Sequence, residues 1–108
     1  EVNLWKCVVA FRGYKFKTMS GLPFTYTLKK GRGDEFTKEL WIDRREDSKS
    51  LAWSSVTLAY HNIGKIGEVV DRPKALGDIR GVSYIYGLFY RFGLIDVLDK
   101  VKEKMTKR

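Results

Sequence analysis

The chain offers few side chains that could carry out catalysis. His61 is the only histidine and Cys7 the only cysteine, so neither a histidine cluster nor a cysteine cluster for a metal is available. A lone cysteine beside apolar residues usually packs as a small apolar side chain. The carboxylate pairs Asp34–Glu35 and Glu46–Asp47 stand beside arginines in predicted turns. We therefore expect a protein that is not an enzyme and that uses no cofactor.

Binding to phosphates is the better supported chemistry. The chain has 21 basic and 13 acidic residues, a net charge of +8, and such a surface attracts nucleic acids, acidic proteins or anionic membranes. Residues 29–35 read KKGRGDE, a predicted hairpin turn. This turn carries a first basic cluster: Lys29, Lys30 and Arg32. Each lysine or arginine can make a sequence-independent contact to a phosphate.

A second basic cluster lies in residues 42–55, IDRREDSKSLAWSS, around the start of a predicted helix. Its cations are Arg44, Arg45 and Lys49. A helix N-terminus with serine hydroxyls and free amides is a favourable place for an anion. The alternative explanation of the same residues is ordinary helix capping in a solvated loop. Nearby acidic residues also reduce the net positive charge of this cluster. Both interpretations stay open.

The aromatic residues concentrate in residues 81–95, GVSYIYGLFYRFGLI. A membrane-spanning helix needs about 20 apolar residues, and this run is shorter and contains Arg91. We therefore expect no membrane partner. The lone cysteine suits a reducing compartment, which favours a cytoplasmic location.

The first half of the chain is predicted to form one helix and three strands. Residues 3–12 have apolar side chains at helical spacing, with a glycine after them, which indicates a short helix. A strand from Lys6 to Phe11 is the alternative. Residues 14–18, 24–30 and 35–43 alternate or are rich in threonine and aromatic residues, which indicates strands. The sequence therefore predicts a three-stranded antiparallel meander, followed by a charged connection over residues 44–50.

The second half is predicted to be helical. Residues 51–63 have helical periodicity, and Glu68–Val70 can form a short extended piece. A short helix is expected over residues 73–79, because proline suits a first helical turn. Residues 94–108 place Leu94, Leu98, Val101 and Met105 on one face of a terminal amphipathic helix.

Between these helices, residues 82–92 carry two stripes at helical spacing. Val82, Ile85, Phe89 and Phe92 form a core stripe. Tyr84, Leu88 and Arg91 form a second stripe that either packs on the meander or stays exposed as a contact patch. Tyrosine and arginine are favoured at interface hot spots, so Tyr84 and Arg91 are candidate contact residues.

Residues 73–95 also resemble a helix-turn-helix unit: a short helix, a glycine turn, a longer helix and the phrase Arg-Phe-Gly-Leu. In that family the second helix lies in the major groove of DNA. The resemblance implies that Arg80, Ser83, Tyr84 and Tyr86 face DNA. Residues 73–95 depart from the family pattern in two ways: the second helix is mostly apolar, and Gly87 stands where a buried valine is expected.

The sequence thus predicts an α+β fold with a three-stranded antiparallel meander packed against three or four helices. We expect a single domain over residues 1–108, with the helix and meander in 1–47 and the helical part in 48–108. The predicted function is non-catalytic nucleic-acid binding, with DNA favoured over RNA. The alternative is a protein–protein interaction module, an inhibitor or adaptor that recognises an acidic protein or nucleoprotein. The sequence leaves the oligomeric state open.

Overall fold

The computed structural model describes residues 2–44, 47–67 and 69–106, and it is an α+β fold, as predicted. The α-helices are α1 (Val2–Ala10), α2 (Trp53–Ile66), α3 (Val82–Arg91) and α4 (Asp99–Thr106). Two short 3-10 segments are η1 (Arg32–Asp34) and η2 (Pro73–Leu76). The strands are β1 (Phe16–Lys17), β2 (Pro23–Lys30), β3 (Phe36–Arg44) and β4 (Asp47–Ala52). No helix within these described ranges is long and apolar enough to cross a membrane.

The sheet has four antiparallel strands in the order β1-β2-β3-β4, so the prediction of three strands was wrong. The additional strand is β4, which replaces most of the expected charged connection. It pairs with β3 in the register Leu40↔Leu51 and Trp41↔Ser50. Its polar sequence gives no apolar alternation, but β4 lies at the edge of the sheet, where polar and charged residues are common. Helix α2 consequently begins at Trp53 rather than at residue 51.

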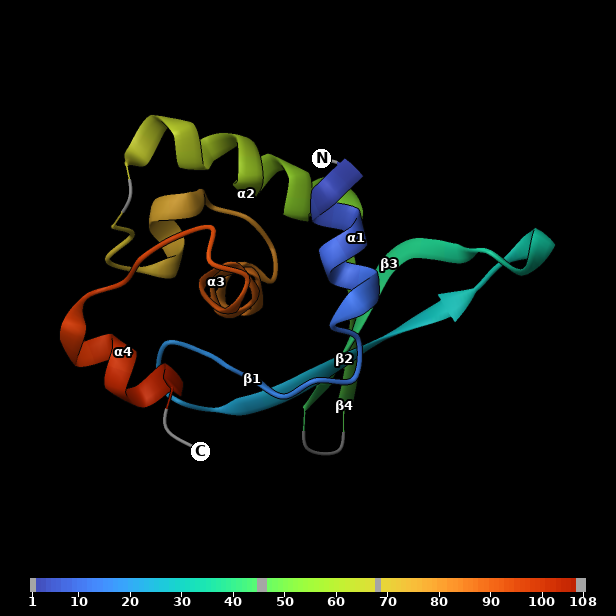
Figure 1. The fold of residues 1–108 in the computed structure, drawn as a ribbon, viewed down its shortest axis with the longest axis horizontal. Helices are drawn as coiled ribbons and strands as arrows, with labels where there is room; N and C mark the ends of the chain where they lie inside the picture. The colour runs from blue at the N-terminus through green and yellow to red at the C-terminus, as the bar shows by residue number, and fades with distance from the viewer. Residues whose placement is uncertain (1, 45–46, 68, 107–108) are drawn as a thin grey trace.

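Helix α3 occupies the centre of the fold. Figure 1 shows it nearly end-on, with α2 on one side and the β1–β2 segment on the opposite side. Ile85 and Phe89 of the predicted core stripe are fully buried, and so is Leu88 of the second stripe. Tyr84 is only 8% exposed. The second stripe is therefore covered at Tyr84 and Leu88, and only Arg91 lies open.

Gly87 allows α3 to lie directly against β1. A Cβ at this position would lie 2.5 Å from the Lys17 carbonyl oxygen and 3.1 Å from a ring carbon of Phe24. The valine that a helix-turn-helix unit would place here has no room. A glycine inside a helix costs stability relative to alanine, so its presence here is explained by this close approach.

The C-terminal helix begins at Asp99, not at Leu94 as the periodicity predicted. Gly93, with a φ of +79°, ends α3. The chain then runs extended, and Asp96 forms a parallel bridge with Val69 inside the predicted extended piece. Ile95 and Val97 are buried at a spacing of two residues, which is a strand-like pattern. This alternation competes with the helical spacing of the leucines and prevails because it fills the core.

Candidate functional site

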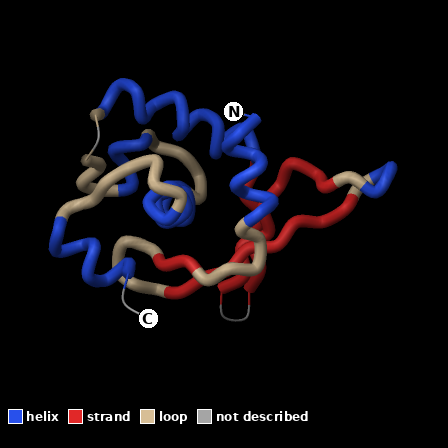
Figure 2. The backbone as a smooth tube through the Cα atoms, viewed as in Figure 1, coloured by secondary structure: helices blue, strands red, loops and turns tan. Residues whose placement is uncertain are grey.

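The β2–β3 hairpin projects from the body of the molecule, and η1 forms its tip (Figures 1 and 2). The tip turns through Gly33 and Asp34, both with positive φ values, of 72° and 67°. Glycine and aspartate are among the residues that tolerate this region of the backbone map. The first predicted cluster, Lys29, Lys30 and Arg32, is exposed at this end of the hairpin. Its position next to a tight turn therefore follows from local sequence.

Aromatic rings lie beneath the lysines of the hairpin. The Lys29 ammonium nitrogen is 3.8 Å from the centroid of the Trp41 ring, and that of Lys30 is 5.9 Å from the Phe36 ring. Consecutive strand residues point to opposite faces, so the two lysines occupy different faces of the hairpin. Both rings are half-buried. Each face of the hairpin therefore presents a cation beside an aromatic surface.

Helices α1 and α2 add a second group of rings next to the hairpin. The rings of Trp5 and Trp53 meet edge to face at 5.0 Å. The Lys38 ammonium nitrogen lies 5.4 Å from the first ring and 5.9 Å from the second. The Arg12 guanidinium lies 5.2 Å from the centroid of the Phe36 ring. We call these nine residues the hairpin surface: Arg12, Lys29, Lys30, Arg32, Lys38, Trp5, Phe36, Trp41 and Trp53.

A buried hydrogen bond holds α1 against the sheet and so positions Trp5 and Arg12. The Tyr26 hydroxyl on β2 donates to the Val8 carbonyl at 2.5 Å. Tyr26 is fully buried. Burial raises the pKa of its phenol well above the ordinary value, because the charged form would be desolvated. The phenol therefore stays a neutral donor at physiological pH.

The hairpin surface is basic but not free of acids. Lys30 makes an exposed ion pair with Asp34 at 3.6 Å. Exposed pairs of this kind are worth only about 0–1 kcal/mol, so Lys30 remains available to another anion. Sequence reasoning missed Arg12 and Lys38 as members of the surface. A usable signal existed for Arg12, because residues 2–33 contain seven basic residues and no acidic residue.

The second predicted cluster is not part of the hairpin surface. Arg44 ends β3, and Lys49 on β4 pairs in register with Ile42. Arg45 lies outside the described residues. Strand β3 starts beside the tip and rises about 3.3 Å per residue, so its backbone places Arg44 at the end of the hairpin away from η1.

The remaining predicted residues lie around α3. Arg80 is exposed and lines a hollow of about 550 Å³ together with Trp41, Ser50 and Tyr84. Arg91 is exposed and donates from Nη1 to the Lys15 carbonyl at 3.1 Å. Arg80 and Tyr84 thus approach a member of the hairpin surface, because Trp41 lines the same hollow.

The structure buries Tyr84 and Tyr86, two of the four residues that the helix-turn-helix resemblance placed against DNA. Tyr84 packs edge to face on the Phe24 ring at 5.1 Å. Tyr86 is fully buried and its hydroxyl donates to the Val70 carbonyl at 2.5 Å. Burial raises the pKa of Tyr86 to about 12. These two tyrosines face the interior and are not available to read base edges, whereas Arg80 and Ser83 are exposed.

The single histidine and the single cysteine of the chain lie on different helices. His61 is exposed on α2 and Cys7 is half-buried on α1. Across the described ranges, no three histidine, cysteine, aspartate or glutamate residues are grouped so that they could hold a metal ion. Comparisons with protein-family models, curated proteins and solved structures find no match for this chain.

Proposed function

We propose that the protein binds nucleic acid through the hairpin surface, with its cations on phosphates and its rings against unpaired bases. The observation that carries the proposal is the pairing of exposed cations with half-buried aromatic rings on a projecting hairpin. Proteins that bind single strands combine a basic surface along the backbone with rings on which bases stack. The hairpin carries both components, with Lys29 beside Trp41 on one face and Lys30 beside Phe36 on the other.

The internal cation–π contacts are weak enough for a base to replace them. At exposed sites such a contact is worth about 0.5–1 kcal/mol. Stacking of a base on an aromatic side chain is worth about 1–3 kcal/mol. A base that stacks on Trp41 would therefore displace Lys29, whose ammonium group would then be free to contact a neighbouring phosphate.

The experiment is a fluorescence anisotropy titration with labelled 20-nucleotide DNA and RNA, each as a single strand and as a duplex, from 50 to 200 mM salt. We expect single strands to bind more tightly than duplexes. All three tryptophans belong to the hairpin surface, so their intrinsic fluorescence should be quenched on binding. No binding of any of these nucleic acids at 50 mM salt would overturn the proposal, because electrostatic attraction is strongest at low salt.

The key variant is Lys29→Gln/Lys38→Gln, which removes one cation from each group of rings. Each phosphate contact to a single strand contributes about −0.7 to the slope of log Kobs against log salt. The double variant should therefore lose about 1.4 from this slope. The matched control is Lys65→Gln/Lys74→Gln, which removes two exposed lysines away from the hairpin. Equal slopes for the two double variants would contradict a role for the hairpin.

A protein partner is the second candidate, because tryptophan and arginine are also the residues most enriched at protein interface hot spots. A tagged protein would capture such a partner from a cell extract. Capture that survives nuclease treatment and is lost in Trp41→Ala would favour this function. Capture that disappears with nuclease would favour nucleic acid.

A further inference from the structure

We propose that a second site, at the end of the molecule away from the hairpin tip, binds a small amphipathic anion: a molecule with an apolar body and a carboxylate or phosphate group. The site is a hollow of about 530 Å³ between the loop of residues 18–22, the start of α3 and one face of α4. Small-molecule sites typically have volumes of about 300–1,000 Å³. In Figure 1, α4 and the hairpin tip lie at opposite ends of the molecule.

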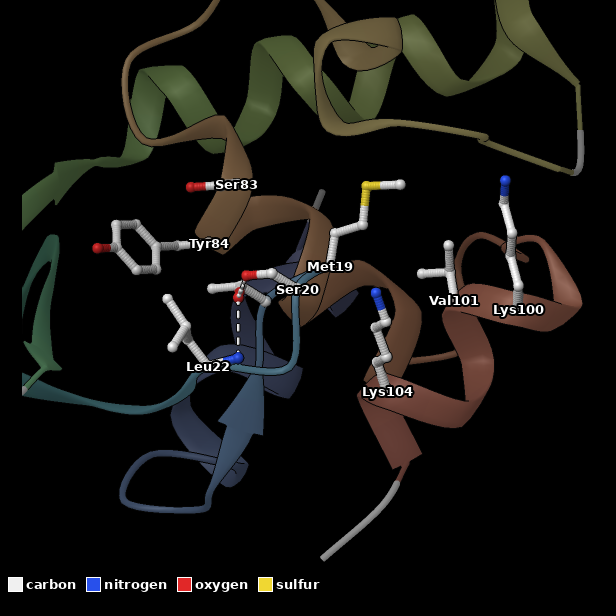
Figure 3. Close-up of a pocket in the computed structure, with 9 residues that line it drawn as sticks. Met19, Ser20, Leu22, Ser83, Tyr84, Lys100, Val101 and Lys104 are labelled. Carbon is white, nitrogen blue, oxygen red and sulfur yellow. Dashed lines mark hydrogen bonds between the residues drawn. The ribbon is translucent and has the colours of Figure 1, made fainter.

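The floor of the hollow is apolar. Met19 and Leu22 contribute from the loop, and Val101 contributes from α4. Leu22 is 41% exposed, which makes it one of the large apolar side chains that the fold leaves open. Figure 3 shows these side chains around the same space as Tyr84 of α3. An apolar ligand body in the hollow would remove this surface from water.

The rim of the hollow carries two exposed lysines. Lys100 and Lys104 are exposed and stand four residues apart, so they lie on the same side of α4. Neither makes an ion pair with any residue in the described part of the chain. Lys102, between them in sequence, behaves differently, because it pairs with Asp96 at 3.1 Å and with Asp99 at 3.8 Å. Asp96 and Asp99 therefore pair with Lys102 and not with the two rim lysines, which can bind an anion.

The loop that closes the hollow has a defined shape. The Thr18 hydroxyl oxygen accepts a hydrogen bond from the Leu22 amide and lies 3.2 Å from the Ser20 hydroxyl. Gly21 has a φ of +89°, and a Cβ there would be 3.4 Å from the Lys104 carbonyl oxygen. The loop therefore lies directly on α4. Ser20 and Ser83 add hydroxyl groups to the lining of the hollow, and a hydroxyl group can donate a hydrogen bond to an anion.

The combination of an apolar floor and a basic rim selects the ligand class. A neutral apolar molecule would leave the lysines unused, and a cationic molecule would be repelled by them. A hydrophilic anion would gain nothing from the floor. The charge and the size together therefore point to a small amphipathic anion.

The test uses 1-anilinonaphthalene-8-sulfonate, a fluorescent aromatic anion, titrated into the wild-type protein. We expect saturable binding that decanoate displaces and decanol does not. Displacement by decanol as effective as that by decanoate would overturn the proposal, because the lysines would then play no role. Displacement by a 20-nucleotide single strand would also overturn it, since the hollow would then belong to the nucleic-acid surface.

Two matched pairs of variants locate the probe. Leu22→Asp places a negative charge in the floor, and Leu58→Asp makes the same change at another exposed leucine, on α2. Only the first should abolish binding. Lys100→Gln/Lys104→Gln should weaken binding about 2- to 30-fold, as two exposed ion pairs allow, and Lys65→Gln/Lys74→Gln should not. Unchanged thermal unfolding identifies variants that keep the fold. Equal affinities within both pairs would refute the site.

Discussion

Replacement of Gly87 by alanine tests directly how α3 is held at the centre of the fold. The new Cβ would lie 2.5 Å from the Lys17 carbonyl oxygen. Comfortable contacts between heavy atoms begin at about 3.5 Å, so α3 and β1 would have to separate by about 1 Å. The Lys17 carbonyl belongs to the main chain of β1, so it cannot rotate away as a flexible side chain could.

Two effects of opposite sign contribute to the expected change in the free energy of unfolding. Alanine is favoured over glycine inside a helix by about 1 kcal/mol. Overpacking of a well-filled core costs about 1–3 kcal/mol, and the upper end applies because the clash involves backbone. The net expectation is a loss of about 2 kcal/mol. At about 4–8 °C per kcal/mol for a domain near this size, the melting temperature should fall by about 8–16 °C.

The control is Gly64→Ala in α2, where an added Cβ meets nothing within 4 Å. Here only the helix propensity changes, so stability should rise by up to about 1 kcal/mol. Both variants are measured by urea unfolding and by thermal unfolding followed by circular dichroism. A Gly87→Ala protein as stable as the wild type, or stabilised like the control, would refute the proposed packing of α3 on β1.

Three further predictions concern the hydrogen bonds of Tyr86, Asp96 and Tyr26. Burial raises the pKa of Tyr86 from 10.0 to about 12. The contribution of this group to the free energy of unfolding should therefore be complete below pH 10 and decrease by up to about 3 kcal/mol as pH rises through 12. Tyr86→Phe should show a shallower loss of stability in urea titrations at alkaline pH. The pKa of Asp96 is lowered, first by its hydrogen bond from Lys102, so the wild type should lose stability as pH falls below about 4, and an equal loss in Asp96→Asn would count against this. Tyr26→Phe should cost about 1–3 kcal/mol by leaving the Val8 carbonyl unpaired; an unchanged urea midpoint would contradict that role.

The helical periodicity of residues 82–92 predicted the central helix correctly because it is strong and local. Ile85 and Phe89 recur at the spacing of one helical face, and both are fully buried. The second stripe was ambiguous for a physical reason. Whether Tyr84 and Leu88 are covered depends on where β1 and β2 lie, and the pattern along one helix contains no information about neighbouring elements.

Strand β4 and the start of α4 were predicted wrongly for related reasons. Strand β4 is stabilised by backbone pairing with β3, which any residue except proline can make, so its polar sequence gave no signal. Before α4, the helical spacing of Leu94 and Leu98 competed with the alternation of Ile95 and Val97. The core accepts the second pair, and the parallel bridge to Val69 keeps the chain extended there.

The sequence alone determines the net charge, the lack of a histidine or cysteine cluster, and the exposed basic turn at residues 29–35, because these depend on composition or on neighbouring residues. Only the tertiary structure places Lys38 of β3 over rings from α1 and α2, and only it sets Lys100 and Lys104 opposite the loop of residues 18–22. Both arrangements join residues that are far apart in the chain. Their proximity is decided by the packing of whole elements around α3, which no local pattern encodes.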